Sequence, residues 1–321
     1  MDIHVQPGSI VCGVDGSADA ARGLHWAAEQ ASLERRPLVI VTAAGLDQVG
    51  ALTWAGAAGT LVIPTDELVE RVRTIAESAA ASVKGMRPEL EVVAQAAPGD
   101  PRDVLTRLSE RAHLVVVGSR GRGALRSRLL GSVSATVGRR SSCPVVVCRP
   151  ESAGRVRKGV VVGIDGTPEG HTVLDFAFRV ASERALPLTV LHSVYDSLAA
   201  ANGPHLVVPV SEGLAEERLL VAEQLAGFTD KYPDVHVDAR LARGLPDECL
   251  ATDSVRWHLV VVGRHPTDSL SRMLSPTVAT AVMERARTTV AVVPVPARGT
   301  PAVRDLPRLT AYPPRLGHEH L

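Results

Sequence analysis

The residues best suited to do chemistry lie in a glycine-rich stretch, GSRGRGALRSRLLGS, at positions 118–132. Gly118 is followed after two residues by Gly121 and, after nine more, by Gly131 and Ser132, and the stretch comes directly after the apolar run LVVV. A buried strand that passes through glycines into a helix leaves backbone N–H groups unpaired, and glycines let an anion approach them closely. Two such segments nine residues apart suit a polyphosphate, so the stretch predicts a nucleotide-binding loop.

Side chains around this loop admit a functional and an ordinary interpretation. Ser132 is expected to cap a helix predicted over 132–141, where its hydroxyl would also reach an anionic oxygen. The glycines alone are compatible with a tight turn, but their extended spacing favours nucleotide binding. Four arginines either meet phosphates or are simply solvated, and they are Arg120, Arg122, Arg126 and Arg128.

The chain contains an internal repeat. IVCGVDGS at 10–17 returns as VVVGIDGT at 160–167, and HLVVVG at 113–118 returns at 258–263. Each copy has the length of an ordinary domain, and a stretch with Pro and Gly but without hydrophobic periodicity separates the copies. We therefore expect a first domain over 1–153, a second over 154–297 and a disordered tail over 298–321.

Apolar runs and amphipathic helices alternate along each copy. Continuous Val, Ile and Leu runs joined by helices are typical of parallel strands buried on both faces. The expected fold class is α/β, with two tandem doubly wound parallel five-stranded sheets of the Rossmann-like kind, which bind ligands at the carboxyl ends of the strands. In copy one we expect strands at 9–14, 38–43, 90–96, 114–118 and 144–148, and helices at 18–35, 66–84, 101–111 and 132–141; copy two repeats that order.

Composition narrows the possible partners. Lys plus Arg equals Asp plus Glu at 35 each, so there is no overall positive field to hold a nucleic acid. The four cysteines lack metal-ligand spacing and are interpreted as buried thiols of a reducing compartment. No leader and no apolar run of the roughly 20 residues that a membrane span needs is evident. We expect a cytoplasmic protein without membrane contact, and either a flap or a plain surface loop at 51–59.

The motifs at 10–17 and 118–132 resemble those of the universal stress proteins of the ATP-binding type, and the resemblance extends over roughly 8–296. It implies an adenine nucleotide alpha-hydrolase-like fold, ATP as ligand with or without Mg²⁺, and tandem chains that pair again as a homodimer. Asp15 before Gly-Ser is equally typical of a turn or helix-capping aspartate. The resemblance implies the following contacts: Val14 and Asp15 beside the nucleoside, the backbone of Ala43 at the adenine edge, and Gly118, Gly121, Gly131, Ser132, Val133 and Ser134 along the phosphates.

Copy two departs from the family pattern at its phosphate loop. Pro266 stands where copy one has Gly121, and Pro276 with Thr277 stands where copy one has Gly131 and Ser132. Each proline removes a backbone N–H donor and fixes φ. We expect copy one to bind ATP and copy two to supply mainly packing surface, although a first-turn proline followed by a hydroxyl leaves weak binding by copy two open.

The sequence shows no evident catalytic group. No GKS or GKT follows the glycines, and neither a kinase HRD motif nor an SGGxDS loop occurs, so we expect at most a slow ATPase. The resemblance implies a nucleotide-dependent regulator of the stress or dormancy response that acts through protein partners. The alternative is a nucleotide-free interaction or scaffold module whose copies pack as a pseudo-dimer through the strands VVVC and VAVV.

Overall fold

The structure is a computed structural model, and the part of the chain that it describes covers most of both copies. The described residues are 5–44, 65–121, 130–150, 158–194, 214–266 and 277–296. The segment predicted as a flap, residues 122–129 of the glycine-rich stretch and the predicted tail lie outside the described residues.

In the first half, parallel strands alternate with helices in the predicted order. The strands are β1 (Ile10–Gly13), β2 (Leu38–Ala44), β3 (Val92–Pro98), β4 (Leu114–Gly118) and β5 (Val145–Cys148), and the helices are α1 (Ala18–Glu34), α3 (Thr65–Met86), α4 (Pro101–Leu108) and α5 (Ser132–Arg140). The predicted ranges differ from these bounds by a few residues at most.

The second half repeats this order. Its strands are β6 (Val160–Ile164), β7 (Leu188–Val194), β8 (Val237–Arg243), β9 (Leu259–Arg264) and β10 (Thr289–Pro294), and its helices are α6 (His171–Glu183), α8 (Ala215–Leu225), α9 (Phe228–Lys231), α10 (Pro246–Ala251) and α11 (Val278–Arg285). The short 3₁₀ turns Pro168–Gly170 and Ser254–Arg256 precede α6 and β9.

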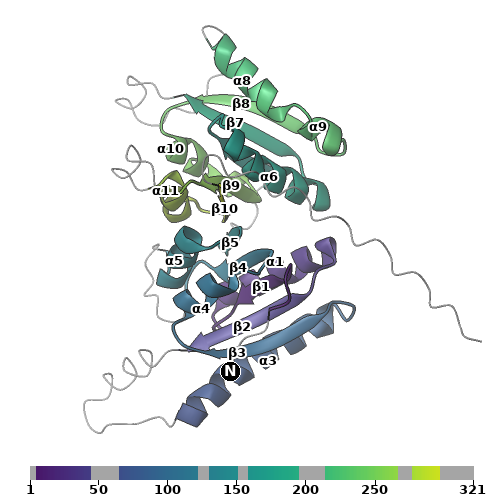
Figure 1. Ribbon diagram of the computed structural model, residues 1–321, viewed down its shortest axis with the longest axis vertical. Coiled ribbons are helices and arrows are strands. Elements are labelled where there is room, and N and C mark those ends of the chain that lie inside the picture. Colours follow the sequence, from purple (N-terminus) through teal and green to yellow (C-terminus); the bar gives the residue numbers. More distant parts are fainter. Residues whose placement is uncertain are drawn as a thin grey trace, which may run out of the picture.

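The two halves share one ten-stranded sheet, in the order β3-β2-β1-β4-β5-β10-β9-β6-β7-β8. Pairing within each half is parallel, whereas β5 and β10 pair antiparallel with Val146 opposite Ala291. Figure 1 shows the halves stacked along the long axis of the molecule, with β5 and β10 between them. The α/β class with two tandem, doubly wound halves is confirmed, and so is the packing of the copies through their terminal strands.

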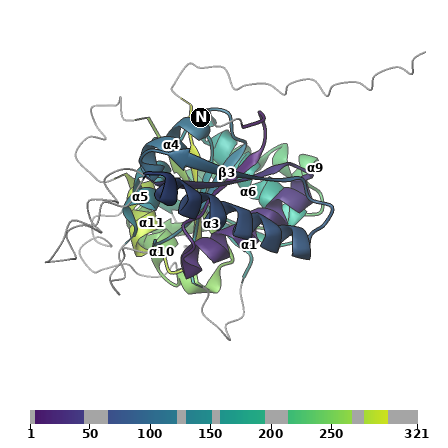
Figure 2. The same ribbon diagram turned by 90° about the horizontal axis from the view of Figure 1, so that it is seen from below.

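Helices cover both faces of the sheet, because successive strand residues point to opposite sides. Ile10 and Cys12 lie in a core packed beneath α1, α3 and α6, while Val11 lies in a second core beneath α4, α5, α10 and α11. Figure 2, seen along the stack, shows α1 and α6 on one side and α5, α10 and α11 on the other. Each core contains residues of both halves, so the halves form a common interior.

A polar network also joins α1 to α6. Glu34 is almost buried, and its Oε1 lies 2.6 Å from Nη1 of Arg179, while its Oε2 lies 2.8 Å from Nε2 of His113. Nε of Arg184 donates a hydrogen bond of 2.9 Å to Oε1 of Gln30. The contact between the halves therefore extends beyond the sheet to charged groups on one layer of helices.

Two carboxyl groups in this network have opposite pKa shifts. Burial alone would raise the pKa of Glu34, but the contact with His113 and the charge of Arg179 hold it at about 2. Burial and the neighbouring negative charge of Glu34 raise the pKa of Glu183 to about 6. The network therefore stabilises the ionised form of one carboxyl group and disfavours that of its neighbour.

Candidate functional site

The candidate site lies at the carboxyl ends of β1, β2 and β4, where a chain of this topology places its ligands. Asp15 follows β1 and accepts a hydrogen bond of 2.9 Å from the N–H of Ser17. Ser17 is the N-cap of α1, and its Oγ accepts from the N–H of Ala20. The turn role that the sequence allowed for Asp15 is thus present, and it fixes the start of α1.

Val14 and Ala43 lie beside this turn with different exposure. Val14 is 8% exposed and packs in the core beneath α1, and its N–H bonds the carbonyl of Val41. Ala43 is partly buried near the end of β2, in register with Ala97 of β3. The side chain of Val14 therefore supports the core, and Ala43 lies near the carboxyl end of its strand.

The three glycines of the loop let chain segments approach one another closely. A Cβ on Gly118 would lie 2.5 Å from the carbonyl carbon of Asp19 in α1, and a Cβ on Gly121 would lie 2.7 Å from Oδ2 of Asp15. A Cβ on Gly131 would lie 3.2 Å from the carbonyl oxygen of Ser119. Side chains at these positions would push apart the strand ends, the first turn of α1 and the start of α5.

The start of α5 differs from the expectation in one respect. The N-cap is Gly131, which has no side-chain cap, and Ser132 is the first helical residue and is exposed. The prediction that Ser132 caps this helix is wrong, because the helix begins one residue earlier than a Ser132 cap would require. The Oγ of Ser134 donates either to Ser119 O, at 3.1 Å, or to Gly131 O, at 3.0 Å.

The first turn of α5 presents unpaired backbone donors. The N–H of Gly131 bonds the carbonyl of Ser119 at 2.8 Å, and the helical ladder starts with the N–H of Ala135 on the carbonyl of Gly131. Within the described part of the chain, the N–H groups of Ser132, Val133 and Ser134 have no acceptor. Such donors at a helix start bind anions, because they carry the positive end of the helix dipole.

A buried carboxylate that sequence reasoning missed anchors the loop to α1. Asp19 is 6% exposed, and its Oδ2 accepts 2.7 Å from Oγ of Ser119 and 3.1 Å from Nε of Arg120. Burial would raise the pKa of Asp19, but these hydrogen bonds together with nearby guanidinium charges lower it below its usual value. The sequence signal for Asp19 was an acidic residue in the first turn of α1. Its partner Ser119, however, lies 100 residues away in the chain.

The corresponding edge of the second half is arranged differently. Asp165 accepts from the N–H of Thr167 at 3.0 Å, as Asp15 does from Ser17, but its Oδ2 also lies 2.6 Å from Nε2 of His265. Burial opposes this ionisation, and the bond with His265 nevertheless holds the pKa of Asp165 well below its usual range.

The helix start of the second half has a side-chain cap. Thr277 is the N-cap of α11, and its Oγ1 accepts from the N–H of Thr280 at 3.4 Å. Pro266 stands at the position of Gly121 and has no N–H. Thr277 therefore takes up one backbone N–H at the start of α11, whereas no side chain caps the start of α5.

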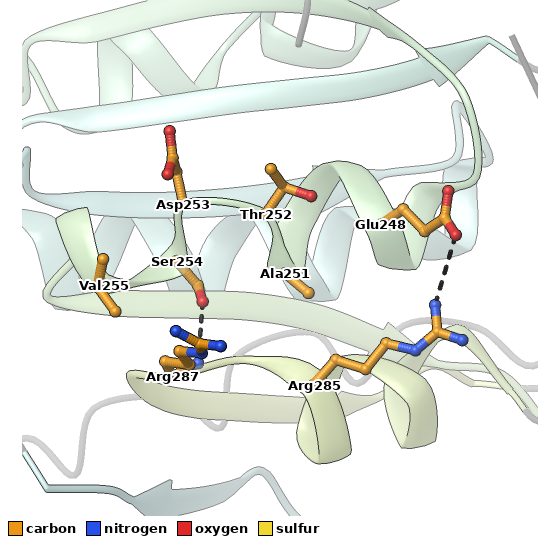
Figure 3. A pocket seen from close by; sticks show the side chains of 8 residues that line it. All are labelled: Glu248, Ala251, Thr252, Asp253, Ser254, Val255, Arg285 and Arg287. Carbon is orange, nitrogen blue, oxygen red and sulfur yellow. Dashed lines mark hydrogen bonds and ion pairs between the residues drawn. The ribbon is translucent and has the colours of Figure 1, made fainter. Parts of the chain in front are cut away.

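A hollow of about 570 Å³ lies elsewhere, in the second half. Figure 3 shows Arg285 reaching toward Glu248 and the backbone of Arg287 bonded to Ser254. The residues before β9 and β10 line it, so it opens at the amino ends of these strands and not at their carboxyl ends, where ligands of such sheets bind. The bond between Arg287 and Ser254 recurs in the first half between Ser142 and Ser109, which indicates a structural role.

The described residues contain no group of three or more His, Cys, Asp and Glu side chains arranged to hold a metal ion. No helix of the described part combines the length and the apolar character that crossing a membrane requires.

Comparison with known proteins agrees with this architecture. The model of the universal stress protein family matches residues 8–149 and again 157–294. Universal stress protein Rv2005c of Mycobacterium tuberculosis is 33% identical over 288 residues, 88% of this chain and 96% of that protein. A universal stress protein of Mycolicibacterium smegmatis is 32% identical over 292 residues, again 88% and 96% of the two chains.

Among solved structures, a universal stress protein from Archaeoglobus fulgidus has a TM-score of 0.62 at 18% identity, covering 90% of this chain and 99% of that one. At this identity the likeness shows the fold. The two family matches and the long alignments with mycobacterial relatives show that the chain belongs to the universal stress protein family.

Proposed function

We propose that the first half binds ATP at the carboxyl edge of β1, β2 and β4. In this proposal the triphosphate lies on the N–H groups of Ser132, Val133 and Ser134 and on the backbone at Gly118, Gly121 and Gly131. Asp15 and the backbone at Val14 lie beside the nucleoside, and the backbone at Ala43 meets the adenine. The family of the chain supports this assignment, because the same positions carry the glycine spacing of its ATP-binding members.

The observation that carries the proposal is the open start of α5. Its three N–H groups have no acceptor in the described part, and glycine as N-cap offers no side chain to cover them. A buried or half-buried helix start without partners is unfavourable, and a phosphate oxygen satisfies it. The residues present therefore fit a phosphate chain.

We propose that the second half does not bind ATP in the same way. His265 already pairs with the carboxylate that corresponds to Asp15, and Thr277 already caps the helix that corresponds to α5. Its antiparallel contact through β10 supports the role of a packing partner for the first half.

We also propose that the protein regulates a stress response through protein partners. This proposal is based on its family and on a site whose backbone N–H groups can bind phosphate. Under this proposal ATP turnover is slow at most, and ATP binds with or without Mg²⁺. The tandem chains pair as homodimers. A cytoplasmic location stays a prediction of the sequence.

Titration calorimetry with ATP on the full chain tests the proposal. Gly121→Ala should weaken ATP binding about tenfold or more, because the added Cβ meets Asp15 and moves the loop. Gly85→Ala is the matched control, since a Cβ there meets nothing within 4 Å. Absence of ATP binding by the unaltered chain, or equal affinity of Gly121→Ala, would overturn the proposal in favour of a nucleotide-free interaction module.

A further inference from the structure

Three guanidinium groups gather around the buried carboxylate of Asp19. Arg22 lies one turn further along α1 and forms an ion pair with Oδ1 of Asp19, while Nε of Arg120 donates to Oδ2. Arg149 follows β5 directly. Burial lowers the pKa of its guanidinium, and its charge also interacts with the charges of Arg120 and Asp19. We call these residues the Asp19 cluster.

The Asp19 cluster lies against the phosphate loop. Arg120 stands between Gly118 and Gly121 in the chain, and a Cβ on Gly131 would lie 3.3 Å from the Cα of Arg120. The backbone of Arg120 is held in this place, because the Oγ of Ser17 donates to its carbonyl at 3.4 Å. The guanidinium of Arg120 is thus attached where both glycine segments and the start of α5 converge.

The cluster carries more positive charge than Asp19 balances, and Nη2 of Arg149 also donates to the carbonyl of Met283 in α11. One carboxylate faces three guanidinium groups, and a single ion pair would suffice to neutralise Asp19. Within the described residues, the Nε groups of Arg22 and Arg149 are buried and have no acceptor. Guanidinium groups with spare donors recognise phosphate oxygens in preference to neutral groups.

The second half lacks this arrangement at the same positions. By the repeat, Glu169 corresponds to Asp19, Thr172 to Arg22 and Arg264 to Ser119. His265 corresponds to Arg120 and is held by Asp165. The cluster is therefore a feature of the half in which no side chain caps the helix start.

We propose that Arg120, assisted by Arg22 and by the charge of Arg149, binds the outer phosphates of the ligand and makes the first half selective for a triphosphate over a monophosphate. Asp19 holds these side chains beside the loop, and Arg120 exchanges part of this contact for phosphate oxygens on binding. This inference rests on the proposed function and adds to it the number of phosphates that the site requires.

Calorimetry on the full chain with ATP, AMP and inorganic tripolyphosphate tests the inference. Arg120→Gln should weaken ATP and tripolyphosphate binding about tenfold or more and leave AMP within about twofold, because only the outer phosphates lose a charged hydrogen bond. Arg102→Gln is the control: Arg102 pairs with Asp100 at the start of α4, an exposed pair of the same kind at the same edge of the sheet.

The outcomes separate this inference from the proposed function. Equal losses for ATP and AMP, or no loss in Arg120→Gln, overturn the role of Arg120 while ATP binding stands. Tripolyphosphate that binds as tightly as ATP and is lost in Arg120→Gln supports the cluster but contradicts adenine recognition. A chain that binds AMP and ATP equally, or binds none of the three probes, overturns the inference. A thermal melt of each variant confirms that it is folded.

Discussion

Asp15 and Asp165 occupy the same position in the two copies and have different neighbours. Both accept a backbone N–H two residues further on, from Ser17 and Thr167. Asp165 is also paired with His265, whereas Oδ2 of Asp15 faces Gly121. The same residue type therefore forms a turn in both halves but is directed toward a glycine loop only in the first.

Exchanging these carboxylates for amides separates the role in the turn from the role in ATP binding. Asp15→Asn should weaken ATP binding about tenfold, since a charged acceptor beside the nucleoside is lost. The turn should persist, because the amide oxygen still accepts the N–H of Ser17. Asp165→Asn should leave ATP affinity unchanged, and calorimetry on both variants checks the pair. Equal effects of the two exchanges would contradict the asymmetry between the halves.

At this scale the sequence predicted positions better than contacts. The three glycines were predicted from their spacing and Asp15 from the resemblance, and all four lie at one edge of the sheet. Asp19 was missed, although it joins α1 to the loop through Ser119 and Arg120. Its partners depend on how β4 and α1 pack, which a local motif does not reveal.

Among the elements, α5 and α11 are equivalent helices with different starts. Gly131 leaves α5 uncapped by a side chain, while Thr277 caps α11 and lies one position later in the repeat. Through this one-residue difference the N–H of Thr280 in α11 gains a side-chain acceptor, and α5 has no such cap. It could not be predicted from the sequence, because the N-cap position shifts by a residue with the local backbone.

Removing the two hydroxyls tests this difference. Thr277→Ala should lower the free energy of unfolding by about 0.5–1 kcal/mol through loss of the cap. Ser132→Ala should change it by less than about 0.5 kcal/mol, because Ser132 is exposed and does not cap α5. Urea denaturation of the two variants gives the comparison. A larger loss in Ser132→Ala than in Thr277→Ala would restore the original capping prediction.

The network between α1 and α6 predicts a pH dependence. The pKa of Glu183 rises from 4.5 to about 6 on folding, so its contribution to stability is complete below pH 4.5 and is lost as the pH rises through about 6. The pKa of Glu34 shifts the other way, to about 2, so its contribution is present above pH 4.5 and is lost as the pH falls toward 2.

Glu183→Gln should therefore flatten the fall in stability between pH 4.5 and 6 and raise the free energy of unfolding at pH 7 by about 1 kcal/mol, after allowance for its partial exposure. Chemical denaturation at several pH values measures it. Glu89→Gln, an exposed carboxyl group distant in sequence from this network, should follow the unaltered chain. If the Glu183→Gln variant has the same pH profile as the unaltered chain, burial and the charge of Glu34 do not raise the pKa of Glu183.

On the scale of the whole molecule, the two similar halves form one continuous sheet with common cores. The Val-rich runs predicted the strands and their order along the chain, and the pairing of β5 with β10 belonged to the alternative in which the copies pack as a pseudo-dimer. The sequence did not reveal Arg179 and Arg184 of one half bonding Glu34 and Gln30 of the other. Strand runs carry their own periodicity, whereas contacts between surface helices depend on the final angle between the halves.

We propose that one half of this tandem chain binds ATP and that the other does not. Native mass spectrometry of the full chain, titrated with ATP, counts the bound nucleotides directly. We expect one ATP per chain at concentrations that saturate the first half. Two ATP per chain with equal affinity, or none at all, would contradict it.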